Sequence, residues 1–178
     1  EAARRTGEVL ASAGKAIIYG AGGNGLMGSV ADGALSKNGK VFGVVPQFLQ
    51  DLELTHKGLT ELKVVEDMRV RKHLMLEGST AVVTLPGGCG TYEELFEALT
   101  MKRLGQWLGP IILVNTEGFY DRLINFLEHS VEERFMGSQH LNMWSVVDTP
   151  EQIIAALENA PAWGDDALQI ANVTAANA

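Results

Sequence analysis

Residues 81–94 read AVVTLPGGCGTYEE, which is an apolar, β-branched run, a glycine-rich turn and then a helix-forming segment. Residues 15–28, KAIIYGAGGNGLMG, repeat this order nearer the start of the chain. A short β-branched run that ends at glycine or proline predicts a buried strand, and periodic apolar residues after the turn predict a helix. Two such units predict an α/β fold.

The alternation of strands and helices continues along the rest of the chain. Strands are expected at 15–19, 41–45, 62–65, 81–85, 110–114 and 146–147. Helices are expected at 3–13, 26–35, 67–77, 91–104, 120–133 and 150–157. This pattern is typical of a doubly wound parallel sheet, the Rossmann-like architecture.

Length and composition suit one domain. With 178 residues, of which 46% are hydrophobic, the chain can fill one core but hardly two. We therefore expect a single domain over residues 1–158. Residues 159–178 are rich in Ala, Asn and Asp, so this tail is expected to wrap the surface or to fray.

Charge and cysteine content narrow the classes of function. A net charge of −8 argues against nucleic-acid binding, because neutralising a phosphate backbone takes a clustered basic surface. The single cysteine, Cys89, allows no internal disulfide and fits a reducing compartment. No apolar run reaches the roughly 18 residues of a membrane span, and the opening EAARR lacks the apolar core of a signal peptide. We expect a cytoplasmic protein without a membrane partner.

The second glycine turn, residues 86–91, leaves a predicted buried strand and enters a helix. Free backbone N–H groups and the positive end of the helix dipole would converge there, which predicts an anion site, most simply for phosphate. The alternative is a capping box, in which Thr91 and Glu94 only satisfy the first turn of the helix.

The first glycine turn, residues 20–25, fits the pattern G-x-G-x-x-G between a strand and a helix. This pattern alone is a weak sign of dinucleotide binding, and an NAD site also needs an acidic residue after the next strand, where the sequence has Pro46-Gln47. The alternative is that these glycines only permit a tight turn and close packing.

Three further groups of residues could be functional, but each also has an ordinary structural or surface interpretation. Cys89 at a helix N-terminus suggests a nucleophilic thiol, for which His73 is the only nearby partner. Arg71 and Lys72 precede the second turn and either approach it or lie on a solvated helix face. The other histidines show no metal-ligand spacing and are interpreted as satisfied or surface side chains, so no metal is expected.

Two segments together, DMRVRK at 67–72 and PGGCGTYEE at 86–94, resemble the LONELY GUY family of cytokinin riboside 5′-monophosphate phosphoribohydrolases, often mislabelled lysine decarboxylase. The family signature is PGG-x-GT-x-x-E with an upstream M-x-x-R-K, accompanied here by GGNGLMG at 22–28. The similarity runs from about residue 1 to 157 and includes the N-x-x-GFY segment at 115–120.

The resemblance implies roles for individual residues. Arg71 and Glu94 are expected to carry catalysis, and no cofactor is needed. The expected substrate-binding residues are Glu53, Met68, Lys72, Gly87, Gly88, Cys89, Gly90, Thr91 and Thr100, with nucleotide contacts at Gly22 and Gly23. The resemblance also favours a homodimer whose partner helps to close the site.

The sequence departs from the family pattern at three places. Family members begin with a further strand that ends in a Gly-Ser-Ser turn beside the nucleotide, whereas this chain opens in the following helix. The usual histidine of the upstream motif is Arg69 here, and the variable position of the glycine turn, often tyrosine, is Cys89. The last two changes concern base preference.

The expected reaction is hydrolysis of the N-ribosidic bond of cytokinin riboside 5′-monophosphate or AMP, giving free base and ribose 5-phosphate. Glu94 would stabilise the positive charge that develops on the ribose, and Arg71 would pair with Glu94 to keep it ionised. Glu53 and Asp67 are the candidate proton donors to the base. The alternatives are a non-catalytic nucleotide-binding or carrier protein, and a pyridoxal-phosphate decarboxylase using Lys72.

Overall fold

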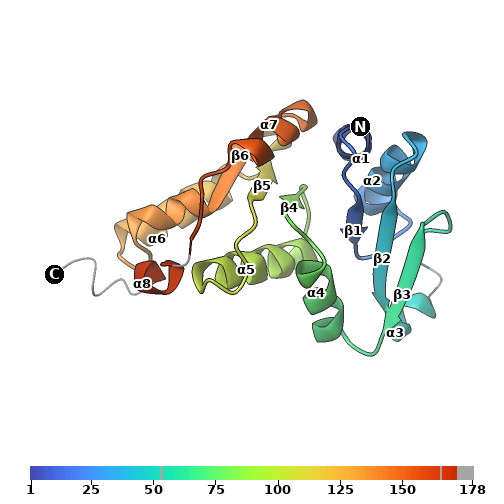
Figure 1. Cartoon of the computed structure of the whole chain (residues 1–178), viewed down its shortest axis with the longest axis horizontal. Helices are drawn as coiled ribbons and strands as arrows, with labels where there is room; N and C mark the ends of the chain where they lie inside the picture. Colours follow the sequence, from blue (N-terminus) through green and yellow to red (C-terminus); the bar gives the residue numbers. More distant parts are fainter. Residues whose placement is uncertain (53, 165, 172–178) are drawn as a thin grey trace. The chain divides into compact units, whose positions relative to one another are not determined.

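The computed structural model describes residues 1–52, 54–164 and 166–171. These residues form two compact units (Figure 1). The N-terminal unit consists of Glu1–Ser79 with Pro150–Ile154, and the C-terminal unit consists of Thr80–Thr149 with the chain from Ala155 onward.

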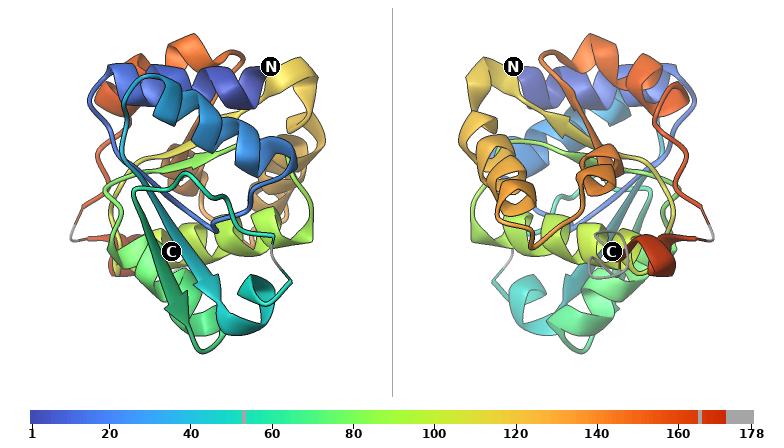
Figure 2. Two further views of the ribbon diagram at one scale, coloured as in Figure 1. Left: turned by 90° about the vertical axis from the view of Figure 1, so that its right-hand side faces the viewer. Right: turned by 90° about the vertical axis from the view of Figure 1, so that its left-hand side faces the viewer.

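The N-terminal unit contains a three-stranded parallel sheet of β1 (Ile17–Tyr19), β2 (Val41–Pro46) and β3 (Glu61–Val65), in that order. Tyr19 pairs with Gly43, so the glycine turn after β1 begins beside the middle of β2. The helices are α1 (Ala2–Ser12), α2 (Gly25–Ser36), the short α3 (Gln47–Gln50) and α4 (Met68–Glu77). Figure 2 shows α1 and α2 side by side, with small residues such as Ala3, Ala31 and Ala34 buried.

The C-terminal unit contains a second three-stranded parallel sheet of β4 (Val82–Thr84), β5 (Ile111–Val114) and β6 (Trp144–Val147). All four residues of the central strand, β5, are buried, as expected for a β-branched run covered on both faces. The main helices are α5 (Cys89–Arg103), α6 (Asp121–Glu132) and α7 (Ile153–Glu158). Two 3₁₀ segments, η1 (Thr116–Gly118) and η2 (Ser138–Met143), lie in this unit, whereas a third, η3 (Pro150–Gln152), belongs to the N-terminal unit.

The described part of the tail is more ordered than its composition indicates. Trp163 is buried, and its indole Nε1 donates a hydrogen bond of 2.8 Å to the carbonyl of Lys102 in α5. A short helix, α8 (Ala167–Ala171), follows, and Ala167 is fully buried. One large aromatic residue therefore fixes a segment that otherwise carries little apolar surface.

The prediction of an α/β fold with parallel strands is confirmed, and the six strands of the described residues form two three-stranded sheets, one in each unit. The predicted elements are present with ends shifted by one or two residues in most cases. The helices α3 and α8 were not predicted. Within the described ranges, no helix combines the length and the apolar character needed to cross a membrane.

Candidate functional site

Helix α4 presents the first part of the candidate site. It begins after Asp67, whose carboxylate accepts hydrogen bonds from the backbone N–H groups of Arg69 and Val70 at 2.8 and 2.9 Å. The N–H of Val70 is the main cause that lowers the pKa of Asp67 below its ordinary value. A carboxylate used in this way is a helix cap, which argues against Asp67 as the proton donor to a leaving base.

Arg71 is buried on the inner face of α4, with 8% of its surface exposed. Its Nε donates to the carbonyl of Val44 in β2 at 3.2 Å, and its Nη1 lies 3.7 Å from the sulfur of Met68. Gly20 lies against the other side of the guanidinium, because a Cβ built on Gly20 would come within 1.6 Å of Nη2. The guanidinium is a cation with several N–H donors, so α4 places a positive charge where β1 ends.

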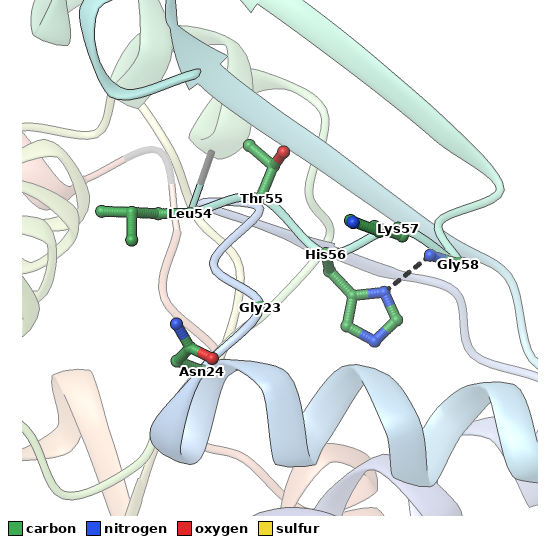
Figure 3. Close-up of a pocket in the computed structure, with 7 residues that line it drawn as sticks. All are labelled: Gly23, Asn24, Leu54, Thr55, His56, Lys57 and Gly58. Atoms are coloured by element: carbon green, nitrogen blue, oxygen red, sulfur yellow. Dashed lines mark hydrogen bonds between the residues drawn. The ribbon is translucent and has the colours of Figure 1, made fainter. Parts of the chain in front are cut away.

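The turn after β1 pairs with the loop that precedes β3. Gly23 donates to the carbonyl of Leu54 and His56 donates to that of Ala21, both at 2.8 Å. These bonds hold the two loops together beside the first turn of α2, and the loops border an open pocket of about 350 Å³ (Figure 3). The pocket is lined by Gly23, Asn24, Leu54, Thr55, His56, Lys57 and Gly58.

His56 forms one wall of this pocket and is held by two contacts. Its Nδ1 accepts a hydrogen bond of 3.0 Å from the N–H of Gly58 (Figure 3). Its Nε2 lies 3.0 Å from a carboxylate oxygen of Asp32. Because Nδ1 accepts, Nε2 is the ring nitrogen that can donate to Asp32. His56 is a satisfied histidine, as predicted.

At Gly20 and Gly22 of the first turn, other side chains of the protein occupy the space where a Cβ would lie. A Cβ on Gly20 would meet Arg71, and one on Gly22 would lie 2.8 Å from the sulfur of Met27. A dinucleotide fingerprint needs this space for a pyrophosphate. The close-packing alternative therefore explains Gly20 and Gly22, whereas Gly23 lines the pocket.

The second glycine turn is built differently. Helix α5 begins at Cys89, and its N-cap is Gly88, in an extended conformation and without a side-chain capping bond. Thr91 is thus the third residue inside the helix, and the capping-box alternative for Thr91 and Glu94 is wrong. The Thr91 hydroxyl instead lies over Gly87, where a Cβ would come within 2.1 Å of Oγ1.

The first turn of α5 has the properties of an anion site. Tyr92 makes the first helical bond, to the carbonyl of Gly88, so the N–H groups of Cys89, Gly90 and Thr91 have no acceptor within the helix. A Cβ on Gly88 or Gly90 would meet no heavy atom within 4 Å. The first turn of this 15-residue helix, where the helix dipole is positive, therefore has free space beside Gly88 and Gly90. The Glu94 carboxylate follows about one turn later.

Tyr120 anchors the strand end that leads into this turn. It is completely buried, and its hydroxyl donates a short hydrogen bond to the carbonyl of Leu85, immediately before Pro86. The Tyr120 N–H donates to the side-chain oxygen of Asn115 at 2.6 Å, and the amide of Asn115 reaches Asp121 at 2.8 Å. Burial raises the pKa of the Tyr120 phenol, which therefore stays a donor. Sequence reasoning identified this segment but not its anchoring role.

The remaining predicted residues are distributed over both units. Cys89 is an exposed free thiol at the start of α5. Thr100 is exposed nine residues beyond Thr91, which is about 14 Å farther along the helix. Lys72 is half-buried in α4. Glu53 lies outside the described residues.

The rival thiol site finds no support in the described geometry. His73, the suggested partner of a Cys89 nucleophile, is exposed and lies 3.3 Å from Glu77. No group of three or more His, Cys, Asp or Glu side chains suited to a metal ion is found among the described residues.

Comparison with known proteins gives three findings. Residues 27–157 match the model of a family described as "Possible lysine decarboxylase". The chain is 40% identical, over 154 residues, to the cytokinin riboside 5′-monophosphate phosphoribohydrolase of Rhodococcoides fascians. The aligned region covers 86% of this chain and 78% of that protein. The chain is 35% identical, over 159 residues, to an Arabidopsis thaliana protein of the same name, with 89% and 75% covered.

A solved structure shares the fold. The molybdenum cofactor carrier protein of Chlamydomonas reinhardtii superposes with a TM-score of 0.67, covering 89% of this chain and 85% of that one. Sequence identity is 20%, so this likeness concerns the fold alone.

Proposed function

Since this chain belongs to the LONELY GUY family, the one that its family model describes as possible lysine decarboxylase, we propose that it is a phosphoribohydrolase. The reaction is hydrolysis of the N-ribosidic bond of a cytokinin riboside 5′-monophosphate or of AMP. Water adds to C1′ of the ribose, the bond from C1′ to the base nitrogen breaks, and a proton passes to the base. The products are the free base and ribose 5-phosphate.

The first turn of α5 carries this proposal. Three N–H groups without helical acceptors, beside two glycines with open space around them, suit the 5′-phosphate of a nucleotide. Binding energy at the phosphate would position the ribose for reaction at C1′. A nucleoside without phosphate is therefore expected to react poorly.

Glu94 is the proposed catalytic carboxylate. It lies three residues beyond Thr91, so a phosphate at the start of α5 would leave the attached ribose near the following turn. Cleavage of the N-ribosidic bond builds positive charge on the sugar, and an ionised carboxylate stabilises that charge and orients the attacking water.

Arg71 is proposed to act in the same reaction by supplying a fixed positive charge. Three features support a functional role rather than a solvated one. The side chain is buried, its Nε is hydrogen-bonded to Val44, and the Nη2 end of its guanidinium lies against Gly20. Arg71→Ala is expected to lower kcat far more than it lowers stability.

The decisive experiment measures release of free base from AMP and from isopentenyl-AMP by chromatography. The parent should release base, Glu94→Gln should not, and the matched control Glu93→Gln, on the neighbouring exposed position of α5, should retain activity. Adenosine tests the role of the phosphate. Comparable turnover of adenosine and AMP would contradict the phosphate site, and tight AMP binding without base release would show a nucleotide-binding or carrier protein instead.

We further propose a cytoplasmic homodimer, and a single structural domain over residues 1–158. The family resemblance supports the dimer, and the partner would help to close the site. Light scattering coupled to size-exclusion chromatography measures the oligomeric state. A monomer that releases base at full rate would contradict the proposed homodimer.

A further inference from the structure

We propose that Gly20 is a positioning residue for Arg71, because the missing side chain at position 20 determines where the guanidinium lies. The inference rests on the proposed function only for its activity readout. Its structural content is a contact within the N-terminal unit, between the residue that follows β1 and a side chain of α4.

The contact is too close for any other residue type. A Cβ on Gly20 would lie 1.6 Å from Nη2 of Arg71, 2.8 Å from its Cζ and 3.0 Å from the terminal methyl of Met27. Real Cβ atoms essentially never come closer than 3.0 Å to a neighbouring heavy atom. Alanine at position 20 would therefore displace Nη2 by more than 1 Å, on the order of one bond length.

The backbone around Gly20 is held more firmly than the arginine. Tyr19 is paired with Gly43 in the sheet, and the carbonyl of Ala21 accepts a hydrogen bond of 2.8 Å from His56. Position 20 is not in the left-handed region of backbone conformations, so alanine adds no backbone strain there. The far end of Arg71 is the flexible partner and is the group expected to move.

The space that holds the guanidinium, between the turn after β1 and β2, is called the slot. Contacts on the side away from Gly20 limit how far Arg71 can move in it. Its Nε is bonded to the carbonyl of Val44, and its Nη1 is in contact with the sulfur of Met68. Displacement away from Gly20 would lengthen one or both contacts. The guanidinium is thus confined between the turn after β1 and the middle of β2, and only glycine at position 20 leaves this slot open.

The functional consequence follows from the cost of misplacing a reacting group. A displacement of about 1 Å in a catalytic side chain lowers the rate by roughly 100-fold. The phosphate turn at α5 is unchanged in Gly20→Ala, so the loss is expected in kcat rather than in KM. If Gly20 only shaped the backbone, the loss of kcat in Gly20→Ala would not depend on the side chain at position 71.

The test is a double-mutant cycle of Gly20→Ala and Arg71→Lys, assayed by base release, with Gly164→Ala as the control at a glycine outside both turns. Lysine lacks both Nη atoms and so removes the closest contact, the one of 1.6 Å with Nη2. We expect Gly20→Ala to lower kcat by about 100-fold in the parent, but by less than about threefold in the Arg71→Lys background. An equal loss in both backgrounds, or no loss in the parent, overturns the proposal.

A second readout needs no activity. The Arg71 Nε–H resonance, identified by its absence in Arg71→Lys, should shift and exchange faster in Gly20→Ala, because its bond to Val44 is disturbed. An unchanged resonance overturns the inference, whether or not the parent releases base. If Gly20→Ala fails to fold but the double variant folds, the collision with Arg71 is established. If both fail to fold, the glycine is required by the backbone and the proposal is wrong.

Discussion

Lys102 is a buried amine whose removal is expected to stabilise the protein. Only 1% of its surface is exposed, and its Nζ donates a hydrogen bond of 2.9 Å to the carbonyl of Gly109. Over residues 1–52, 54–164 and 166–171, no carboxylate forms an ion pair with it. Burial without a counter-charge lowers the pKa of Lys102 from 10.5 to about 8.

The size of the effect follows from the shift in pKa. Each factor of ten in proton affinity is worth about 1.4 kcal/mol, so the fall from 10.5 to about 8 corresponds to about 3 kcal/mol against the charged form in the folded state. Replacing the amine with methionine removes this cost but also removes one hydrogen bond, worth about 1 kcal/mol. Lys102→Met should therefore be more stable than the parent by about 2 kcal/mol at pH 7.

The stability difference between Lys102→Met and the parent should change with pH in a defined direction. Between pH 8 and 10.5 the unfolded chain keeps its proton on Lys102 while the folded chain loses it, so the parent gains stability as pH rises. Urea unfolding at pH 7, 8, 9 and 10 should show the advantage of Lys102→Met shrinking to about zero at pH 10. Lys15→Met, at an exposed position, is the control. A constant difference across this range, or a less stable variant at pH 7, would refute the reasoning.

Three further changes test other parts of the structure. Tyr120→Phe removes the hydroxyl that binds Leu85 and should lower the free energy of unfolding, measured by chemical denaturation, by about 1 kcal/mol. In steady-state assays it should raise KM for AMP more than it lowers kcat. N-ethylmaleimide should inactivate the parent by alkylating Cys89 at the proposed phosphate turn, and AMP should protect it. Cys89→Ser should stay active and resist the reagent, and inactivation of that variant would place the sensitive group elsewhere. Asp67→Asn should lower the melting temperature above about pH 4, where the carboxylate cap is ionised, and the difference should vanish as pH falls, because the folded-state pKa is lowered. Unimpaired base release by Asp67→Asn would support its role as a cap, and complete loss of release would restore it as the proton donor.

The strands and main helices could be predicted because their signals are local. Runs such as 41–45 and 110–114 are β-branched and end or begin at proline, and the helices between them carry periodic apolar residues. Helix α8 could not be predicted in this way. Its order depends on Trp163, which is buried because its indole finds the carbonyl of Lys102, some sixty residues earlier in the chain. No local pattern reports such a partner.

The capping-box alternative failed for a physical reason. The spacing of Thr91 and Glu94 satisfies the local motif, but helix α5 starts two residues before Thr91. Glycine is itself acceptable at an N-cap, and Gly88 adopts the extended conformation that this position needs. The local motif was therefore present in the sequence but shifted out of register with the helix.

The two glycine turns look alike in sequence but differ in what occupies the space beside them. At the first turn, the sites where Cβ atoms would lie on Gly20 and Gly22 are taken by Arg71 and Met27, so the glycines serve contacts inside the protein. At the second turn, the corresponding space beside Gly88 and Gly90 contains no protein atom within 4 Å. At the first turn a side chain already occupies the space that a Cβ would need, whereas at the second turn we propose that the glycines allow a ligand to come close. A glycine-rich turn between a strand and a helix does not distinguish these two causes, so the sequence alone could not separate the contact of Gly20 with Arg71 from the ligand site proposed at α5.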